Sequence, residues 1–183
     1  MIASGQDIRL ALQGVFELAR LRPSGLGYFR RDIIGFWQSF TAALISLPVI
    51  FLDVFLGTES VPATMSGLHF AVNHILIYVI NWLLFPLIIF YLLKVTNRRH
   101  LFFDFIVPYH WANLPITFLI IIIQVAIGAP ILLLFGVICA LWIVHAVARF
   151  GLQLPVPHAI GFVLFSFTLN LVVDFQLRNL AGI

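Results

Sequence analysis

Long apolar runs alternate with short polar segments along this chain. Each run has close to the ~20 residues that an α-helix needs to cross ~30 Å of hydrocarbon. The runs cover about residues 36–56, 68–93, 106–127, 130–148 and 157–177. The pattern therefore predicts an all-α fold, a polytopic transmembrane helical bundle with five spans.

Composition supports a membrane location. Hydrophobic residues make up 62% of the 183 residues, charged residues only 9%, and the mean hydropathy is +1.11. A soluble fold of this composition would lack the polar side chains to cover its surface. We expect a cytoplasmic N-terminal arm at 1–35, too short for a core of its own, followed by a five-helix transmembrane domain at 36–183.

Basic residues lie on alternate connections between the spans. Nine fall on one side: Arg9, Arg20, Arg22, Arg30, Arg31, Lys94, Arg98, Arg99 and Arg149. Arg178 is alone on the other side. The positive-inside rule therefore predicts a cytoplasmic N-terminus and, after five crossings, a C-terminus on the outer side. Because these charges follow the topology, the net charge of +3 gives no reason to expect nucleic-acid binding.

The third span is the least regular of the five. Pro108 and Pro115 interrupt its start and leave about residues 114–127 as uninterrupted apolar helix. Two structures fit this pattern: two full spans over 106–148, or a re-entrant hairpin. In the first span, Ser39 with Ala43 and Ala42 with Ser46 are small residues at helical spacing, which favours close packing against another helix.

The N-terminal arm carries an amphipathic helical pattern from Gln6 to Arg20, which Pro23 ends. Its apolar positions repeat at helical spacing, and its polar positions include arginines. We expect this helix to lie at the membrane interface among anionic headgroups, because its narrow apolar face needs no protein to bury it. The alternative is a docking helix for a partner protein.

Several polar side chains fall at one depth toward the outer side of the predicted bundle. They are Asp53, His69, Asn73, His74, Gln124, Asn170 and Asp174. Carboxylates and imidazoles could bind a cation or carry protons there. The simpler interpretation, which we favour, is that most are solvated near the interface and that Asp174 pairs with Arg178 one turn away. No metal-ligand spacing is present, and the single Cys139 excludes a thiolate cluster.

Two further polar positions lie inside predicted spans. Asn81 is near the middle of the second span, where a buried asparagine typically forms a hydrogen bond with a neighbouring helix. His145 lies near the end of the fourth span, four residues before Arg149. We expect His145 to be a structural hydrogen-bonding residue and Arg149 to extend toward the headgroups.

The connection from Lys94 to Asn113 combines a basic cluster with aromatic residues. Such groups anchor a protein at a leaflet boundary or hold a partner. The possible lipid or partner contacts of the chain are Arg20, Arg22, Arg30, Arg31, Arg98, Arg99 and Trp111.

Together, the five spans, the N-terminal arm and the segment FFDFIVPYHWANLP resemble small bacterial inner-membrane proteins of the Yip-type five-pass family. Trp111 and Asn113 match the opening of the third span in that family, and Arg149 matches the residue that closes the fourth. The resemblance covers residues 30–177. It implies an architecture and a bacterial inner-membrane location, and it supplies no catalytic residues.

These features favour a non-enzymatic scaffold or accessory subunit of a membrane complex, with no cofactor. Its partners would be the lipid bilayer and other membrane proteins or a second copy. No nucleophile, base and oxyanion arrangement and no phosphate-binding glycine loop is recognisable. The alternative is a small transporter or channel that uses the outward-facing polar cluster. An intramembrane enzyme acting on lipids ranks third.

Overall fold

The computed structural model describes residues 2–55, 66–126 and 130–182, with side chains described for all of these except 53–55, 125–126 and 130–132. Within this part the chain is all-helical, and five helices are long and apolar enough to cross a membrane. The elements are α1 (Gly5–Ala19), the 3₁₀ helix η1 (Pro23–Tyr28), α2 (Ile33–Phe55), α3 (Gly67–Val95), the 3₁₀ helix η2 (Arg99–Leu101), α4 (Phe102–Ala126), α5 (Pro130–Gly151) and α6 (Val156–Ala181). The predicted five-span helical bundle is confirmed.

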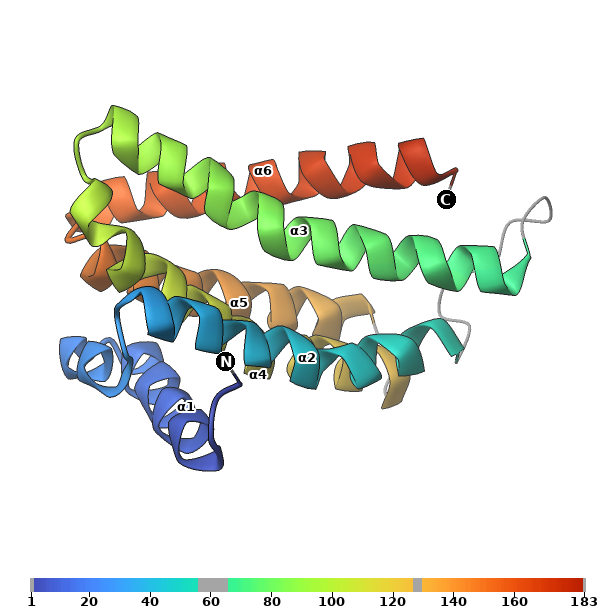
Figure 1. The fold of residues 1–183 in the computed structure, drawn as a ribbon, viewed down its shortest axis with the longest axis horizontal. Coiled ribbons are helices and arrows are strands. Elements are labelled where there is room, and N and C mark those ends of the chain that lie inside the picture. Colours follow the sequence, from blue (N-terminus) through green and yellow to red (C-terminus); the bar gives the residue numbers. More distant parts are fainter. Residues whose placement is uncertain (1, 56–65, 127–129, 183) are drawn as a thin grey trace.

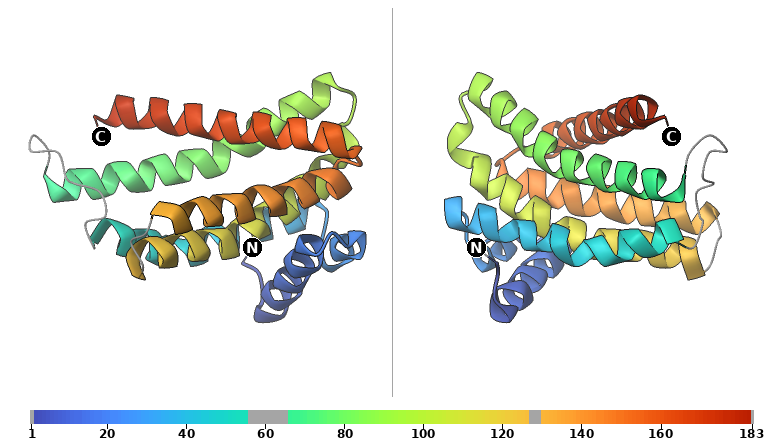
Figure 2. Two further views of the ribbon diagram at one scale, coloured as in Figure 1. Left: turned by 180° about the vertical axis from the view of Figure 1, so that it is seen from behind. Right: turned by 45° about the vertical axis from the view of Figure 1, so that its right-hand side comes forward.

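The five long helices form two layers (Figure 1). The antiparallel pair α3 and α6 makes one layer, and α2, α4 and α5 make the other. The central helix is α4, which contacts α1, α2, α3 and α5. Both views in Figure 2 show α1 and η1 outside the two layers, at the end of the bundle where α3 joins α4 and α5 joins α6.

The structure corrects the third span. Pro108 and Pro115 both lie inside the continuous helix α4, which begins at Phe102, so the connection after α3 is shorter than predicted. Both α4 and α5 are long and apolar enough to cross a membrane, which favours two full spans over a re-entrant hairpin. Proline removes one helical N–H, which frees the carbonyl four residues earlier. For Pro108 that carbonyl belongs to Asp104, and it lies beside Gly151 at the end of α5, where a Cβ would approach it to 2.5 Å. Neighbouring helices enclose α4, which allows the helix to continue through both prolines.

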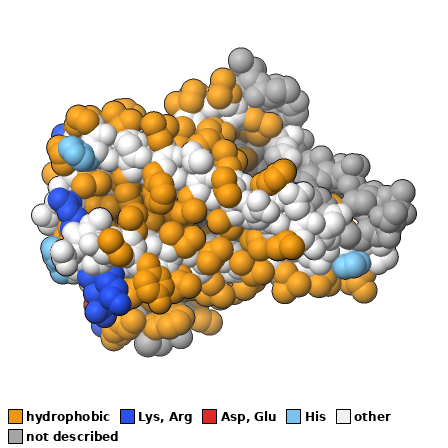
Figure 3. Space-filling model, turned by 90° about the horizontal axis from the view of Figure 1, so that it is seen from above, with side chains coloured by type: hydrophobic (Ala, Val, Ile, Leu, Met, Phe, Trp, Pro, Cys, Tyr) orange, Lys and Arg blue, Asp and Glu red, His pale blue; other side chains and the backbone are white. Residues whose placement is uncertain are grey.

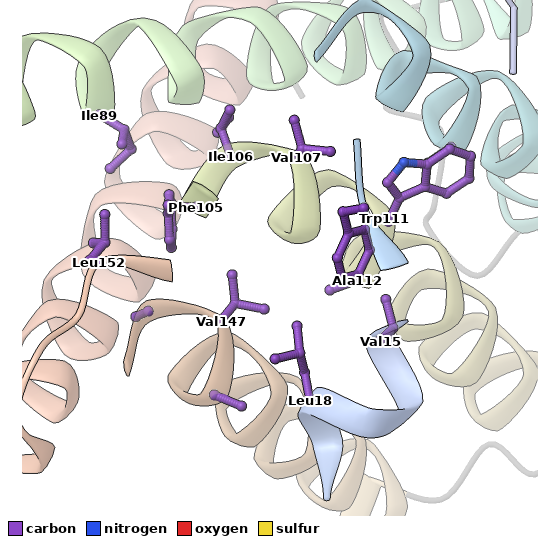
Figure 4. Packing of buried hydrophobic residues seen from close by; sticks show 14 of the residues in the cluster. Val15, Leu18, Ile89, Phe105, Ile106, Val107, Trp111, Ala112, Val147 and Leu152 are labelled. Atoms are coloured by element: carbon purple, nitrogen blue, oxygen red, sulfur yellow. The ribbon is translucent and has the colours of Figure 1, made fainter. Parts of the chain in front are cut away.

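The N-terminal helix α1 packs on the bundle. Ser4 caps it, and the Asp7 carboxylate accepts hydrogen bonds from the Ser4 hydroxyl and N–H, which lowers the pKa of Asp7. Figure 4 shows Val15 and Leu18 pointing toward α4 and α5, and both are buried. The apolar face thus needs protein to bury it, contrary to our expectation, and the interfacial position among headgroups is not confirmed.

Two hydrogen bonds tie the N-terminal segment to the membrane helices. The Trp142 indole Nε1 donates to the Ala19 carbonyl at 2.8 Å, and the Ala3 N–H donates to Thr41 Oγ1 at 3.0 Å. Buried residues of the N-terminal segment also belong to one hydrophobic cluster with residues of α4 and α5. They are part of the folded unit and its packing.

Small residues hold α2 close to α4. The predicted pairs are all buried, namely Ser39, Ala42, Ala43 and Ser46. Since side chains of this size let two backbones approach closely, they explain why the backbone of α2 lies closer to α4 than to α3. The helix α2 meets α3 through longer side chains, since the Tyr78 hydroxyl donates to the Ala43 carbonyl at 2.8 Å.

Candidate functional site

The structure separates the predicted outer polar cluster into parts. On α3, His69 is exposed, the Asn73 amide donates to the Ala181 carbonyl at 3.0 Å, and the His74 ring Nδ1 lies 3.1 Å from the Phe70 carbonyl. Gln124 is half-buried on α4, and the Asp53 side chain lies outside the described residues. Among the described side chains, no group of three or more His, Cys, Asp or Glu residues is arranged to hold a metal ion.

Asp174 has two partners. Arg178 Nε donates to its carboxylate at 2.7 Å, which confirms the predicted pair, and Asn81 Nδ2 lies 3.5 Å from its other oxygen. The expectation that Asn81 bonds a neighbouring helix is also confirmed, because Asn81 is on α3 and Asp174 on α6. This carboxylate is therefore occupied in holding the two helices together.

Asn170 lies one turn before Asp174 on α6 and faces a polar cavity between the two layers. The cavity has a volume of about 130 Å³. Its lining residues are Asn81, Trp82, Phe85, Pro86, Tyr109, His110, Asn113, Thr117 and Asn170. Three asparagines and a histidine from three helices thus line one cavity, and of these only Asn170 belongs to the predicted outer polar cluster.

His110 is the most constrained polar residue of this cavity. Its side chain is 1% exposed, and its Nδ1 lies 2.8 Å from Ser39 Oγ. The Ser39 hydroxyl donates its single proton to the Phe36 carbonyl at 2.6 Å, so Ser39 Oγ accepts from Nδ1–H of His110. In the neutral imidazole, Nε2 is then the acceptor, and this buried atom has no hydrogen-bond partner among the described residues.

A second, mostly apolar cavity adjoins the polar one. It has a volume of about 320 Å³ and shares Tyr109, Asn113 and Asn170 with it. The rest of its lining is almost entirely aliphatic and comes from α4, α5 and α6. The only other polar group there is Ser166, whose buried hydroxyl also has no partner among the described residues. The two cavities are therefore neighbours that have these three residues as a common boundary.

In contrast to these mostly uncharged cavities, the surface at the end of the bundle near η1 and η2 carries many charged side chains. We call it the basic end. In Figure 3 the visible Lys and Arg side chains gather at that end, and hydrophobic side chains cover most of the middle of the face in view. Residues 2–32, 94–104 and 149–155 hold nine Lys and Arg side chains and four carboxylates.

Ion pairs use part of this basic charge. Arg22 pairs with Glu17 at 3.1 Å, and Arg31 pairs with Asp104 at 2.8 Å. Asp32 accepts from the Gly35 N–H and from Arg30, which lowers the pKa of Asp32.

Most predicted lipid or partner contacts lie at the basic end, and one does not. Arg20, Arg22, Arg30, Arg31 and Arg99 are exposed there, and Arg98 donates to the Leu152 carbonyl at 3.0 Å. Trp111 is only 4% exposed and packs in the cluster between α1 and α4. The prediction of Trp111 as an external contact is therefore wrong, because the segment taken for a loop is a buried helix.

His145 and Arg149 line a third hollow, between α5 and α6. Its volume is about 510 Å³ and the rest of its lining is apolar. His145 Nδ1 is buried and has no hydrogen-bond partner among the described residues, so the expected structural hydrogen bond is not found at that atom. Arg149 lies against the Phe150 ring, with 5.3 Å between its guanidinium carbon and the ring centroid.

Comparison with family models, with curated proteins and with solved structures gave no match. The resemblance to the Yip-type family therefore stays a prediction. What the chain can do has to be argued from its own geometry.

Of the residues that line the polar cavity, only Asn170 was among the predicted site residues. Tyr109, Asn113 and Thr117 follow one another at intervals of four, which in a helix places them on one face. This spacing could have identified the polar face of α4. It went unused because the two prolines made the segment look like a loop.

Proposed function

We propose that this membrane protein is a non-enzymatic scaffold or accessory subunit of the bacterial inner membrane, which binds a partner through its basic end. In this proposal the basic end faces the cytoplasm, as the positive-inside rule favours. The resemblance to the Yip-type family supports the same location.

One observation carries the proposal: α1 is fixed to the bundle and η1 is fixed to α1. Gly14 and Gly25 approach so closely that a Cβ on Gly25 would lie 2.8 Å from the Gly14 carbonyl. Leu18 is fully buried beneath this contact. A surface held in one conformation before binding loses little conformational entropy when it binds, so it suits a docking role.

The charge of this surface indicates the kind of partner. Nine basic side chains against four carboxylates leave an excess of positive charge, which complements an acidic segment of another membrane protein. Arg9 and Arg20 are exposed on α1, and the exposed Phe16 ring lies 4.0 Å from the Arg20 guanidinium carbon. Exposed arginine beside an aromatic ring is typical of residues that dominate binding at interfaces.

The test is purification of the tagged protein from native membranes in mild detergent, followed by mass spectrometry. We expect a stoichiometric partner with the wild type. The triple variant Arg9→Gln, Arg20→Gln and Arg22→Gln should reduce its recovery by about tenfold, the equivalent of ~1.4 kcal/mol. Arg178→Gln, at the other end of the bundle, is the matched control and should retain the partner. Recovery of no partner in several detergents would contradict the proposal.

A small transporter or channel is the second candidate. The polar cavity favours it, because Asn81 lines this cavity and also contacts Asp174. If the protein conducts ions or solutes, Asp174→Asn should abolish the flux in reconstituted vesicles, and Asp53→Asn should do the same if Asp53 belongs to the pathway. Unchanged flux in both variants would eliminate this candidate.

A further inference from the structure

The hollow between α5 and α6, which we call the α5–α6 groove, opens on the outer surface of the bundle. Its volume is about 510 Å³, and it shares no lining residue with the polar cavity. Five residues of α5, four of α6 and Leu21 line it. Side chains of both helices are about half exposed along it, such as Ile138 at 55% and Ile160 at 49%. A ligand can therefore reach the groove from outside the protein.

The length of the groove is close to the depth of one lipid leaflet. On α5 its lining runs from Ile138 to Arg149, a stretch of about 16 Å at 1.5 Å per residue. Half of the ~30 Å hydrocarbon core of a membrane is about 15 Å. Most of the lining between these two residues is apolar. The groove therefore has room for one acyl chain that extends from the headgroups toward the middle of the membrane.

A positive charge lies at one end of the groove. Arg149 is two residues before the end of α5, at the basic end of the bundle. It forms no ion pair with any residue that the structure describes, and none of the described lining residues is acidic. A guanidinium group can bind a phosphate through two parallel hydrogen bonds. The charge at this end therefore complements a phosphate group at the level of the headgroups.

The wall that Leu21 provides is a separate indication of a binding site. Leu21 has φ 57°, and its N–H donates to the Leu18 carbonyl at 2.8 Å, while the Arg22 N–H donates to the Glu17 carbonyl at 3.0 Å. This is a Schellman motif at the end of α1, in which the left-handed residue is usually glycine. A leucine is less favourable in that conformation. Its side chain supplies an apolar wall of the groove, which glycine could not.

We propose that the α5–α6 groove binds an anionic phospholipid, whose phosphate pairs with Arg149 and one of whose acyl chains lies between α5 and α6, against Leu21. An anionic headgroup suits the site better than a zwitterionic one, because choline or ethanolamine would bring a second positive charge close to Arg149. A phosphate without an acyl chain would leave the apolar length unfilled. The proposal does not depend on the protein partner, because it uses none of Arg9, Arg20 and Arg22.

Photolabelling of the full-length protein in phosphatidylcholine nanodiscs tests this proposal. The two probes are phosphatidylglycerol and phosphatidylcholine with the same diazirine-bearing acyl chain, and unlabelled phosphatidylglycerol is the competitor. We expect saturable labelling of α5 and α6 by phosphatidylglycerol, about fivefold stronger than by phosphatidylcholine, as one arginine at the headgroups implies. Equal labelling of α5 and α6 by both probes would overturn the proposal. Equal labelling of all five membrane helices by phosphatidylglycerol would do the same.

A pair of arginine variants tests the headgroup contact. Arg149→Gln should lower labelling by phosphatidylglycerol about fivefold, to the level of phosphatidylcholine. Arg99→Gln is the matched control, because Arg99 is also exposed at the basic end and its guanidinium carbon also lies near an aromatic ring, 4.9 Å from the centroid of Phe90. Arg99 is outside the groove, so this variant should label like the wild type. Equal labelling of the two variants would contradict the role of Arg149.

A pair of tryptophan variants tests the position of the acyl chain. Ile160→Trp places a larger ring in the groove and should abolish the saturable labelling, whereas Leu171→Trp, at a position of α6 that is 55% exposed and outside the groove, should retain it. Wild-type labelling of Ile160→Trp would show that the chain lies elsewhere. If a second copy or a partner helix covers the groove instead, neither probe will label it in the wild type, and the proposal is wrong. If Ile160→Trp fails to fold, Arg149→Gln decides.

Discussion

The two helix layers of this protein are held together in different ways. In the layer of α2, α4 and α5, small buried residues bring helices close together, and 56% of the α4 span is buried. In the other layer, only 17% of the α6 span is buried, and polar bonds such as that from Asn81 to Asp174 join it to α3. Burial is therefore concentrated on α4, because the α2 span is 33% buried and the α3 and α5 spans are 22% buried each, whereas α6 faces mostly outward.

This difference explains where the polar cavity and its apolar neighbour lie. Close packing around α4 requires side chains of matching volume, which leaves little free space. Polar side chains that reach across from α3 to α6 hold these helices without filling the space toward α4. The cavities therefore lie along the boundary between the two layers, beside the polar face of α4.

The largest expected effect concerns the core ring of Phe105. Phe105 is fully buried and contacts the rings of Tyr109 and Phe162 at centroid distances of 5.5 and 5.1 Å. Phe105→Ala should lower the free energy of unfolding by about 3 kcal/mol, because it creates a cavity in the packed layer. Phe175→Ala, at a lipid-facing position of α6 that is 63% exposed, should change it little. Unfolding in mixed detergent micelles measures both, and equal effects would contradict the comparison.

A smaller effect should follow from adding one methyl group to each layer. A Cβ on Gly151 would lie 2.5 Å from the Asp104 carbonyl, whereas a Cβ on Gly161 of α6 would meet nothing within 4 Å. Gly151→Ala should therefore destabilise the protein by about 2 kcal/mol, as overpacking does. Gly161→Ala should leave stability unchanged or raise it by up to about 1 kcal/mol, because alanine favours helix. Opposite signs in the same unfolding experiment are the expected result, and a loss of stability in both would contradict it.

The smallest effect should come from the polar tie within the second layer. Asn81→Leu removes the bond to Asp174 but leaves the pair of Asp174 with Arg178, so we expect a loss of only about 0.6 kcal/mol. Thr96→Val is the control, because the Thr96 hydroxyl donates to the Leu92 carbonyl of its own helix. Distance measurements between spin labels on α3 and α6 would report the contact between the two helices. Asn81→Leu should loosen this contact, and Thr96→Val should leave it unchanged. An unchanged distance between these helices in Asn81→Leu, as in the control, would show that the tie is unimportant.

Local features of the fold followed from the sequence because they depend on neighbouring residues. Apolar run length predicted the five spans, and spacing predicted the pair of Asp174 with Arg178. The spacing of Ser39, Ala42, Ala43 and Ser46 likewise predicted a closely packed face on α2. Each of these needs knowledge of a single helix only.

Features that depend on two distant segments were missed. His110 and Ser39 are 71 residues apart, and nothing in either segment indicates their bond. The continuity of α4 through Pro108 and Pro115 was missed for the same reason, since the helices that enclose it come from elsewhere in the chain. The outer polar cluster was predicted only from the depth of its residues in the membrane. Depth does not tell which of these residues face one another across helices.

The buried face of α1 has a consequence for the order in which the chain can fold. Leu18 lies beside Val147 of α5, about 130 residues further along, while Val15 lies nearer Trp111 and Ala112 of α4. At ~5–20 residues per second, the ribosome needs on the order of ten seconds to make that stretch. During this interval α1 has been synthesised but its binding site is incomplete. The helix α1 therefore waits for α5 before it can dock fully, and chaperones and proteases can meet it in an undocked state.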